Sequence, residues 1–337
     1  MYYSYFGLTK EPFAMTPDPA FLFLTAPHRE ALAGLSYAVL GGKGFVVLTG
    51  DAGTGKTTLL TKLLSSIPET RAVFSVILNP TLAPDEFLEL ALLDFGIREV
   101  PASKAQRLVL LRQFLTDARK LGKSCVLIVD EAHKLAPSVL EEIRLLSNFE
   151  LADAKLLQIV MAGQNELTKV LNREDLRQLK QRVCVRLNLP KLSRTDVEHY
   201  IRHRWTKAGG TQDHPFDAES LALITDLSAG IPRLINVICD NALVLAFGEG
   251  VSTVTARQVA EVASDLDLTG PGRRIVRRPP APAMAPSART AGTVNGHTPT
   301  GRYPNIERYV PETPKRSRLA RWTAKLRLGE VRERGYE

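Results

Sequence analysis

Two patterns of apolar positions divide this chain of 337 residues. In the first part, five short runs rich in Val, Ile and Leu hardly alternate with polar residues, which predicts strands covered on both faces. Between these runs apolar residues recur at helical spacing, for example Leu108, Leu111 and Leu115. Strands that alternate with helices indicate an α/β domain around a parallel sheet. The strands are predicted at residues 45–48, 73–78, 125–129, 156–162 and 183–189.

After Pro190 the pattern is helical, and no further strand is predicted. Ser193 is a favourable N-cap for the first helix of this part, and Pro232 suits the first turn of the third. Helices without strands between them predict a small all-helical domain. They are predicted at residues 194–208, 217–228, 232–247 and 255–266.

Composition separates the last part of the chain from the rest. Residues 266–337 carry 15 Lys and Arg against 6 Asp and Glu, whereas the whole chain has a formal charge of +8, so residues 1–265 sum to about −1. Proline-rich stretches such as 279–282 cannot bury a core, which predicts disorder from residue 269. Further on, Leu319, Trp322 and Leu326 share one helical face among basic residues, which predicts a basic amphipathic segment.

The cysteines and the N-terminus indicate the compartment. Cys125, Cys184 and Cys239 form no C-x-x-C pair, and the first two lie inside apolar runs, which predicts buried free thiols in a reducing environment. The first six residues lack the basic and apolar regions of a signal peptide, and no run approaches the roughly 18 apolar residues of a membrane span. The expectation is a soluble, cytoplasmic protein.

The strongest chemical signal is a glycine-rich loop between the first predicted strand and a helix. It fits G-x-x-x-x-G-K-[ST], in which backbone N–H groups and the helix N-terminus face nucleotide phosphates. Lys56 is placed to reach the β- and γ-phosphates, and the Thr57 hydroxyl to ligate Mg²⁺. The predicted nucleotide-binding residues of this loop are Gly50, Asp51, Ala52, Gly53, Thr54, Gly55, Lys56, Thr57 and Thr58.

A second element lies where the third predicted strand ends, at Asp130 and Glu131. Apolar strand residues followed by Asp-Glu are typical of the metal-handling strand of P-loop ATPases, so Asp130 is predicted to hold Mg²⁺ together with Thr57. Glu131 is placed to orient and polarise the attacking water as a general base. These two elements predict a site for ATP and Mg²⁺ at the carboxyl edge of the sheet.

With these motifs, residues 1–265 resemble AAA+ ATPases and, within them, the general secretion pathway protein A group, which is related to transposition ATPases. Without the resemblance, the N-terminal residues predict only an ordered arm rich in aromatic residues and prolines. Two roles of this arm therefore stay open, structural packing and contact with the adenine base. The residues that carry this part of the resemblance are Tyr5-Phe6-Gly7-Leu8, Pro12-Phe13, Thr16-Pro17-Asp18-Pro19, the pair His28 and Glu30, and Gly44-Phe45.

The resemblance implies a three-layer P-loop AAA+ domain with a parallel sheet, a small all-helical lid domain and a disordered basic tail. The implied parts are an N-terminal arm with the first helix of the ATPase domain at 1–40, the nucleotide-binding domain at 41–190, the lid at 191–268, a disordered Pro/Arg-rich linker at 269–314 and the basic amphipathic segment at 315–337.

The resemblance also implies further catalytic residues. Residues 159–167 are similar to the sensor 1 strand, where Gln164 and Asn165 are adjacent candidates to contact the water or the γ-phosphate; Asn165 is alternatively an N-cap. An arginine finger, which reaches the nucleotide of a neighbouring subunit, is implied at Arg182 first and Arg177 second, with a solvated surface role as the alternative. The run at 230–233 is similar to sensor 2 and places Arg233 on the nucleotide.

The predicted function is an AAA+ ATPase that binds and hydrolyses Mg²⁺-ATP in a homo-oligomer, either a ring or a filament. It drives or regulates an assembly around an unidentified protein client, and an envelope secretion or export system is favoured. The alternative is a DNA-binding ATPase that regulates transposition. The basic tail leaves three partners open: an anionic membrane surface at the inner face of the cytoplasmic membrane, DNA, or another protein.

Overall fold

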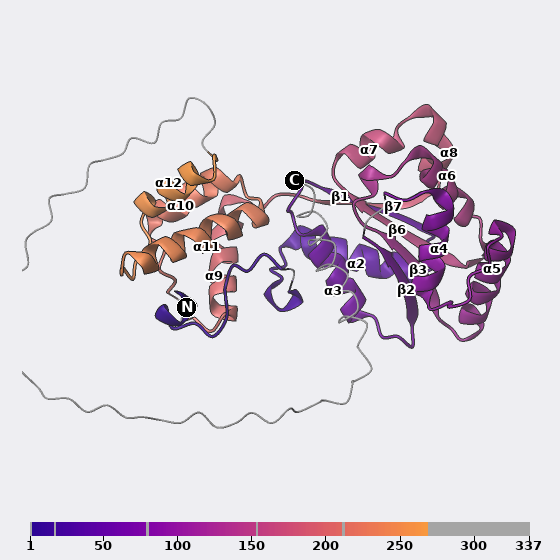
Figure 1. The fold of residues 1–337 in the computed structure, drawn as a ribbon, viewed down its shortest axis with the longest axis horizontal. Coiled ribbons are helices and arrows are strands. Elements are labelled where there is room, and N and C mark those ends of the chain that lie inside the picture. The colour runs from indigo at the N-terminus through magenta and orange to yellow at the C-terminus, as the bar shows by residue number, and fades with distance from the viewer. Residues whose placement is uncertain (1, 17, 79–80, 153, 211–212, 269–337) are drawn as a thin grey trace, which may run out of the picture.

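The computed structural model describes residues 2–16, 18–78, 81–152, 154–210 and 213–268. These residues form an α/β domain and a helical domain that lie side by side (Figure 1). The predicted linker at 269–314 and the basic segment at 315–337 lie outside the described residues. Among the described helices, none combines the length and the apolar character needed to cross a membrane.

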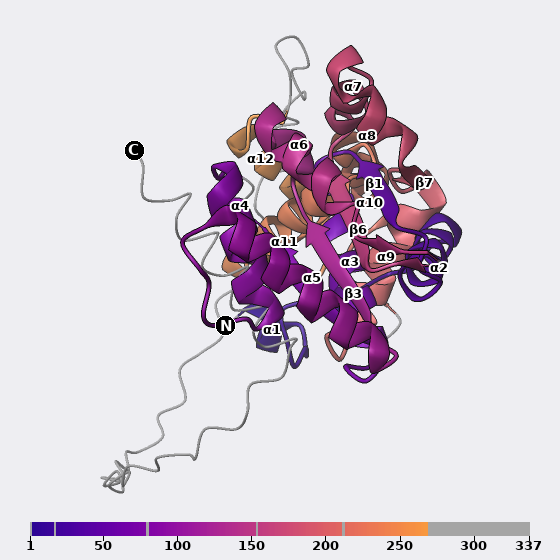
Figure 2. The same ribbon diagram turned by 90° about the vertical axis from the view of Figure 1, so that its right-hand side faces the viewer.

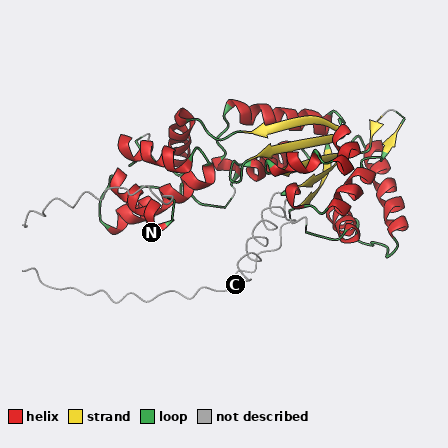
Figure 3. Ribbon diagram, turned by 90° about the horizontal axis from the view of Figure 1, so that it is seen from above, coloured by secondary structure: helices red, strands yellow, loops and turns green. Residues whose placement is uncertain are grey.

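A five-stranded parallel sheet with the strand order β2-β3-β6-β1-β7 organises the α/β domain (Figure 3). The strands coincide with the five apolar runs of the sequence, which confirms the predicted fold class. Because β6 lies between β1 and β3 and all three are parallel, the loops that follow them emerge together at one edge, where α/β proteins bind ligands. The strands are β1 (Phe45–Gly50), β2 (Ala72–Ile77), β3 (Ser124–Val129), β6 (Leu157–Gly163) and β7 (Val183–Leu189).

Alternate residues of the strands point to opposite faces of the sheet, and each face has its own layer of helices (Figure 2). Val46 and Val47 are neighbours in β1 yet belong to two different apolar cores. One core lies beneath α4, α5 and α6, and the other beneath α2 and α3. The helices are α2 (Ala26–Leu40), α3 (Lys56–Ser66), α4 (Pro84–Phe95), α5 (Lys104–Lys120) and α6 (Pro137–Leu146).

The edge strand β7 departs from the prediction that all five strands are covered on both faces. Val185 and Leu187 pack against the core beneath α2, whereas Cys184 and Arg186 are exposed. The prediction of a buried thiol was therefore wrong for Cys184. An edge strand leaves one face open to solvent, and the apolar residues around Cys184 in the sequence do not show that this strand lies at the edge of the sheet. Cys125 is buried as predicted, and this burial raises the pKa of its thiol to about 12.

The helical domain confirms the four helices predicted after Pro190. Ser193 caps the first of them, since its hydroxyl accepts the backbone N–H of Asp196 at 3.2 Å, and Pro232 is the first residue of the third. The helices are α9 (Arg194–Lys207), α10 (Ala218–Ser228), α11 (Pro232–Gly248) and α12 (Ala256–Asp265).

The N-terminal arm packs on the helical domain, along which its indigo trace runs in Figure 1. Its helix α1 (Tyr2–Tyr5) contributes Tyr2 to the apolar core of that domain, and Leu8 and Phe13 join the same core. The chain then passes through a short 3-10 helix (Pro19–Phe21) into α2. Among the described residues, the two domains are thus connected through the segment that leads from the arm into α2 and through residues 190–193.

Short elements complete the α/β domain. They are a 3-10 helix (Ala132–Lys134), a small hairpin of β4 (Glu150–Leu151) and β5 (Ala154–Lys155), α7 (Glu166–Leu171), a second 3-10 helix (Glu174–Leu176) and α8 (Arg177–Gln181).

Candidate nucleotide-binding site

The loop between β1 and α3 closes around its own lysine. Gly53 and Gly55 have φ angles of 77° and 96°, in the left-handed region that favours glycine. Lys56 is 5% exposed, and its Nζ donates to the carbonyl oxygens of Gly50 and Asp51, each at 2.9 Å. Burial lowers the pKa of Lys56. A cation held inside this loop is placed to exchange the two carbonyl oxygens for phosphate oxygens.

The two motifs found in the sequence meet at one hydrogen bond. The Thr57 hydroxyl donates to Asp130 Oδ2 at 2.6 Å, and Asp130 Oδ1 accepts the backbone N–H of Glu131 at 2.9 Å. Asp130 is 3% exposed, and its burial raises the pKa of the carboxyl group although both hydrogen bonds act to lower it. A hydroxyl and a carboxylate oxygen side by side are hard oxygen donors of the kind that Mg²⁺ prefers, so these residues fit the predicted metal.

Glu131 has an unusual backbone conformation for a residue with a side chain. Its φ angle is 52°, and such strained non-glycine residues cluster at functional sites. The side chain is about one-third exposed and lines a cavity at the edge of the sheet. Its Oε2 lies 3.5 Å from His133 Nε2 and 3.7 Å from Lys134 Nζ. The carboxylate is therefore accessible from the cavity and held by two neighbours.

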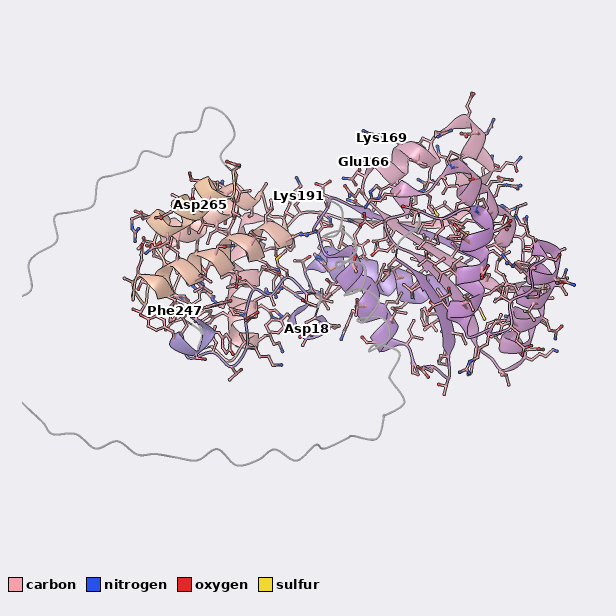
Figure 4. All side chains as sticks on the ribbon, in the orientation of Figure 1. Asp18, Glu166, Lys169, Lys191, Phe247 and Asp265 are labelled. Carbon is pink, nitrogen blue, oxygen red and sulfur yellow. The ribbon has the colours of Figure 1, made fainter. Side chains whose placement is uncertain are left out.

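The polar residues that follow β6 contact both nucleotide motifs. Asn165 is the N-cap residue of α7, but its side chain makes no capping hydrogen bond there, and its Nδ2 group donates instead to Asp51 Oδ1 at 2.5 Å. Gln164 acts through its backbone, whose N–H donates to His133 Nδ1 at 3.3 Å. The second oxygen of Asp51 pairs with Lys191 Nζ at 3.1 Å, and Figure 4 places Lys191 at the junction of the two domains.

Arg233 lies in the first turn of α11, directly against the phosphate loop. Its backbone N–H donates to the Gly53 carbonyl at 3.3 Å. A Cβ atom added to Gly53 would lie 2.7 Å from the Cβ of Arg233, so only glycine permits this approach. The turn before α11 is fixed in the same way, because the Leu192 N–H donates to the Gly230 carbonyl at 2.8 Å.

A cavity of about 300 Å³ lies between the α/β domain, the arm and the helical domain. Residues 53–58 of the phosphate loop line one end of it, together with Glu131 and Arg233. The other loop residues predicted to bind nucleotide, Gly50, Asp51 and Ala52, are not among the described residues that line it. The rest of the lining comes from arm residues such as Met15, Phe21 and Phe23 and from polar side chains of α9 and α11. A cavity that combines the phosphate loop with apolar rings and a few polar groups suits a nucleotide.

The two arginine-finger candidates lie away from this cavity. Arg177 begins α8 and is exposed, whereas Arg182 directly follows α8 and is half-buried. Among the described residues that line the cavity, neither arginine is included. A single chain therefore does not bring either candidate to its own nucleotide site.

Several residues of the site escaped the sequence analysis. His133 directly follows Asp-Glu-Ala, and this spacing was the one available signal for it. Lys191, Tyr200 and Asn236 left no signal, because each is a separate polar residue of the helical domain or its connection. His28 was noted only through the resemblance; its Nδ1 lies 2.6 Å from Thr25 Oγ1, and burial lowers the pKa of its ring.

Comparison with known proteins agrees with this geometry. The AAA domain family matches residues 39–171. The chain belongs to the AAA+ family. It is 42% identical over 270 residues to general secretion pathway protein A of Aeromonas hydrophila. The aligned region covers 79% of this chain and 48% of that protein. The chain thus spans about half the length of this relative.

Solved structures of two other proteins share the fold at low sequence identity. The ORC2 protein of Aeropyrum pernix aligns with a TM-score of 0.59 and 18% identity, over 76% of this chain and 71% of that one. Cdc6p of Pyrobaculum aerophilum aligns with a TM-score of 0.58 and 22% identity, over 74% and 70%. These two structures support the fold, whereas the AAA domain match and the similarity to general secretion pathway protein A confirm the AAA+ resemblance and the nucleotide-binding character of the domain.

Proposed function

We propose that this AAA+ protein binds Mg²⁺-ATP and hydrolyses it. The observation that carries the proposal is the hydrogen bond between Thr57 and Asp130, because it joins the phosphate loop to the strand end that is typical of metal handling. In this proposal Lys56 binds the β- and γ-phosphates. Thr57 and Asp130 hold Mg²⁺, which supplies charge neutralisation on the phosphate oxygens. Arg233 approaches the phosphates from the helical domain, which acts as a lid.

Glu131 is the proposed general base. Its carboxylate lines the cavity beside the phosphate loop, where it can orient a water molecule and accept its proton. His133 and Lys134 lie within 4 Å of the carboxylate and keep it in place. Asn165, which is hydrogen-bonded to Asp51, is the favoured sensor 1 residue, and Gln164 is the second candidate.

The hydrolysis test is the Glu131→Gln variant. It should bind ATP as the wild type does, because the isosteric amide removes no phosphate contact, but it should release phosphate at least about 100-fold more slowly. The control is Glu141→Gln on α6, whose carboxylate pairs with Arg144 on the surface. Phosphate release by Glu131→Gln at the wild-type rate would remove the base assignment.

We also propose that the chain acts as a homo-oligomer in which Arg182, or failing that Arg177, completes the site of a neighbouring subunit. Support comes from the position of both residues outside the cavity of their own chain. A mixture of Arg182→Ala and Glu131→Gln subunits should recover part of the turnover that each lacks alone, because some sites then combine an intact base with an intact finger. If the mixture with Arg182→Ala recovered no turnover, whereas the matched mixture of Arg177→Ala and Glu131→Gln did, Arg177 and not Arg182 would be the arginine finger.

For the pathway, we propose an ATPase that drives or regulates an envelope secretion or export-associated assembly, working in the cytoplasm or at the inner face of the cytoplasmic membrane. The similarity to general secretion pathway protein A supports this choice. The basic segment 315–337 would contact anionic lipid, so its deletion should abolish co-sedimentation with anionic vesicles. Stimulation of the ATPase by duplex DNA, with salt-sensitive binding, would instead favour the DNA-binding regulator of transposition.

A further inference from the structure

Three buried polar side chains of the helical domain form a hydrogen-bonded chain in the wall of the cavity. Tyr200 and Arg204 lie on α9 and Asn236 on α11, and their exposed fractions are 6%, 8% and 7%. The Tyr200 hydroxyl donates to Asn236 Oδ1 at 2.8 Å, and Arg204 Nη1 donates to the Tyr200 oxygen at 3.0 Å. All three residues also line the cavity.

Arg204 extends this chain of hydrogen bonds into the N-terminal arm. Its Nε donates to the Pro12 carbonyl at 2.5 Å, and its Nη2 donates to the Ala14 carbonyl at 3.2 Å. The guanidinium also lies 5.1 Å from the centre of the Phe21 ring, at a distance typical of a cation–π contact. The buried Arg204 cation therefore fixes the arm backbone at two points, at Pro12 and at Ala14, where the cavity-lining part of the arm begins.

Other contacts join the arm to the same domain. The backbone N–H and the hydroxyl of Thr9 both donate to the Ala208 carbonyl, at 2.8 and 2.9 Å. Tyr2 is hydrogen-bonded to Asp240 on α11. Because the arm has these anchors on α9 and α11, it moves with the helical domain whenever that domain moves.

We propose that Arg204 is a positioning residue that locks the arm against α9 and thereby builds the wall that receives the ribose and base of the nucleotide. This inference rests on the proposed nucleotide site and adds its nucleoside half. Asn236 completes the wall. Its Oδ1 is occupied by Tyr200, and among the described residues its Nδ2 group has no protein acceptor, so two donors remain for a ribose hydroxyl or a base nitrogen.

The test compares two ligands that differ only in the nucleoside, Mg²⁺-ATP and Mg²⁺-tripolyphosphate, by isothermal titration calorimetry. Arg204→Ala should weaken ATP binding at least about tenfold, because it removes two charge-assisted bonds to the arm, and should leave tripolyphosphate binding within about twofold. The matched control is Arg202→Ala, two residues away on α9, whose exposed side chain pairs with Glu198 at 2.9 Å. It should bind both ligands like the wild type.

Amide hydrogen exchange gives a second measurement that does not depend on affinity. ATP should slow exchange at the arm amides of Thr9 and Lys10 in the wild type, tripolyphosphate should not, and Arg204→Ala should lose this protection. If Arg204→Ala does not fold, Tyr200→Phe decides, since it removes one hydroxyl from the hydrogen-bonded chain and keeps the ring. It should weaken ATP binding about threefold without affecting tripolyphosphate.

Two results would overturn the inference while leaving the proposed function intact: equal ATP affinity in the wild type and both variants, or an equal loss of ATP and tripolyphosphate binding. A wild type that binds neither ligand would refute the proposed function itself.

Discussion

The two ends of the cavity are built in opposite ways. The phosphate end consists of consecutive residues after β1 and β3, and it gathers a buried lysine, a buried carboxylate and a non-glycine residue with positive φ. The nucleoside end consists of scattered residues from the arm, α9 and α11, whose buried polar groups are joined in one hydrogen-bonded chain. The first end holds strained and buried charged groups that serve its chemistry, whereas in the second the buried Arg204 and Tyr200 are hydrogen-bonded in the free protein and the Asn236 amide keeps its donors for the ligand.

The strongest test of this contrast is Lys56→Ala. Loss of the buried cation should weaken binding of Mg²⁺-ATP and Mg²⁺-tripolyphosphate alike, by about 100-fold or more, since in the proposed complex the lysine binds the phosphates and not the nucleoside. Calorimetric titration with both ligands measures this. The control is Lys62→Ala, a half-buried lysine further along α3. If Lys56→Ala lost ATP but kept tripolyphosphate, the division of the cavity into two ends would be wrong.

The same contrast explains how much the sequence could predict. The phosphate end was predictable because Lys56, Thr57, Asp130 and Glu131 lie in short runs whose spacing is fixed by a strand, a turn and a helix. The parallel order of the sheet then brings the two runs together.

The nucleoside end was not predictable, because the partners of Arg204 lie about 190 positions away and neither the arginine nor the Pro12 and Ala14 carbonyls belong to a pattern. Arg204 therefore looks like any basic residue of a polar helix until the arm is placed against it. The predicted burial of Cys184 was wrong for a related reason. Whether a strand lies at the edge of the sheet depends on the order of the strands and not on the local sequence.

The contact between the phosphate loop and the helical domain can be broken at Gly53. In Gly53→Ala the new methyl group would meet the Cβ of Arg233, so the lid should be displaced and ATP binding should weaken about tenfold. Gly55→Ala is the matched control for backbone strain in the protein without nucleotide, because Gly55 has a similarly positive φ of 96° and no atom within 4 Å of the added Cβ. Hydrogen exchange at the Arg233 amide, which donates to the Gly53 carbonyl, should rise in Gly53→Ala alone. Equal increases in both variants would show that loop strain, and not contact with the lid, governs the result.

The smallest expected effect concerns stability and separates the two ends most directly. Burial raises the pKa of Asp130, so its ionised form destabilises the folded protein at neutral pH, and this cost declines as the pH falls through the raised pKa toward the ordinary value of a carboxyl group. Asp130→Asn removes the charge and keeps the hydrogen-bonding shape, because the Thr57 hydroxyl can accept from the new amide while the carbonyl oxygen still accepts the Glu131 N–H. In the absence of nucleotide this variant should therefore unfold at a higher temperature than the wild type, by about 3 °C for a gain of about 1 kcal/mol.

Differential scanning calorimetry without nucleotide at several pH values measures this gain, which should be largest at neutral pH and shrink toward acidic pH. Arg204→Ala should shift the melting temperature in the opposite direction, because it leaves the Pro12 and Ala14 carbonyls and the Tyr200 hydroxyl without their cation. A wild type more stable than Asp130→Asn at neutral pH would show that the buried carboxylate stabilises the fold, and the energetic difference between the two ends would then disappear.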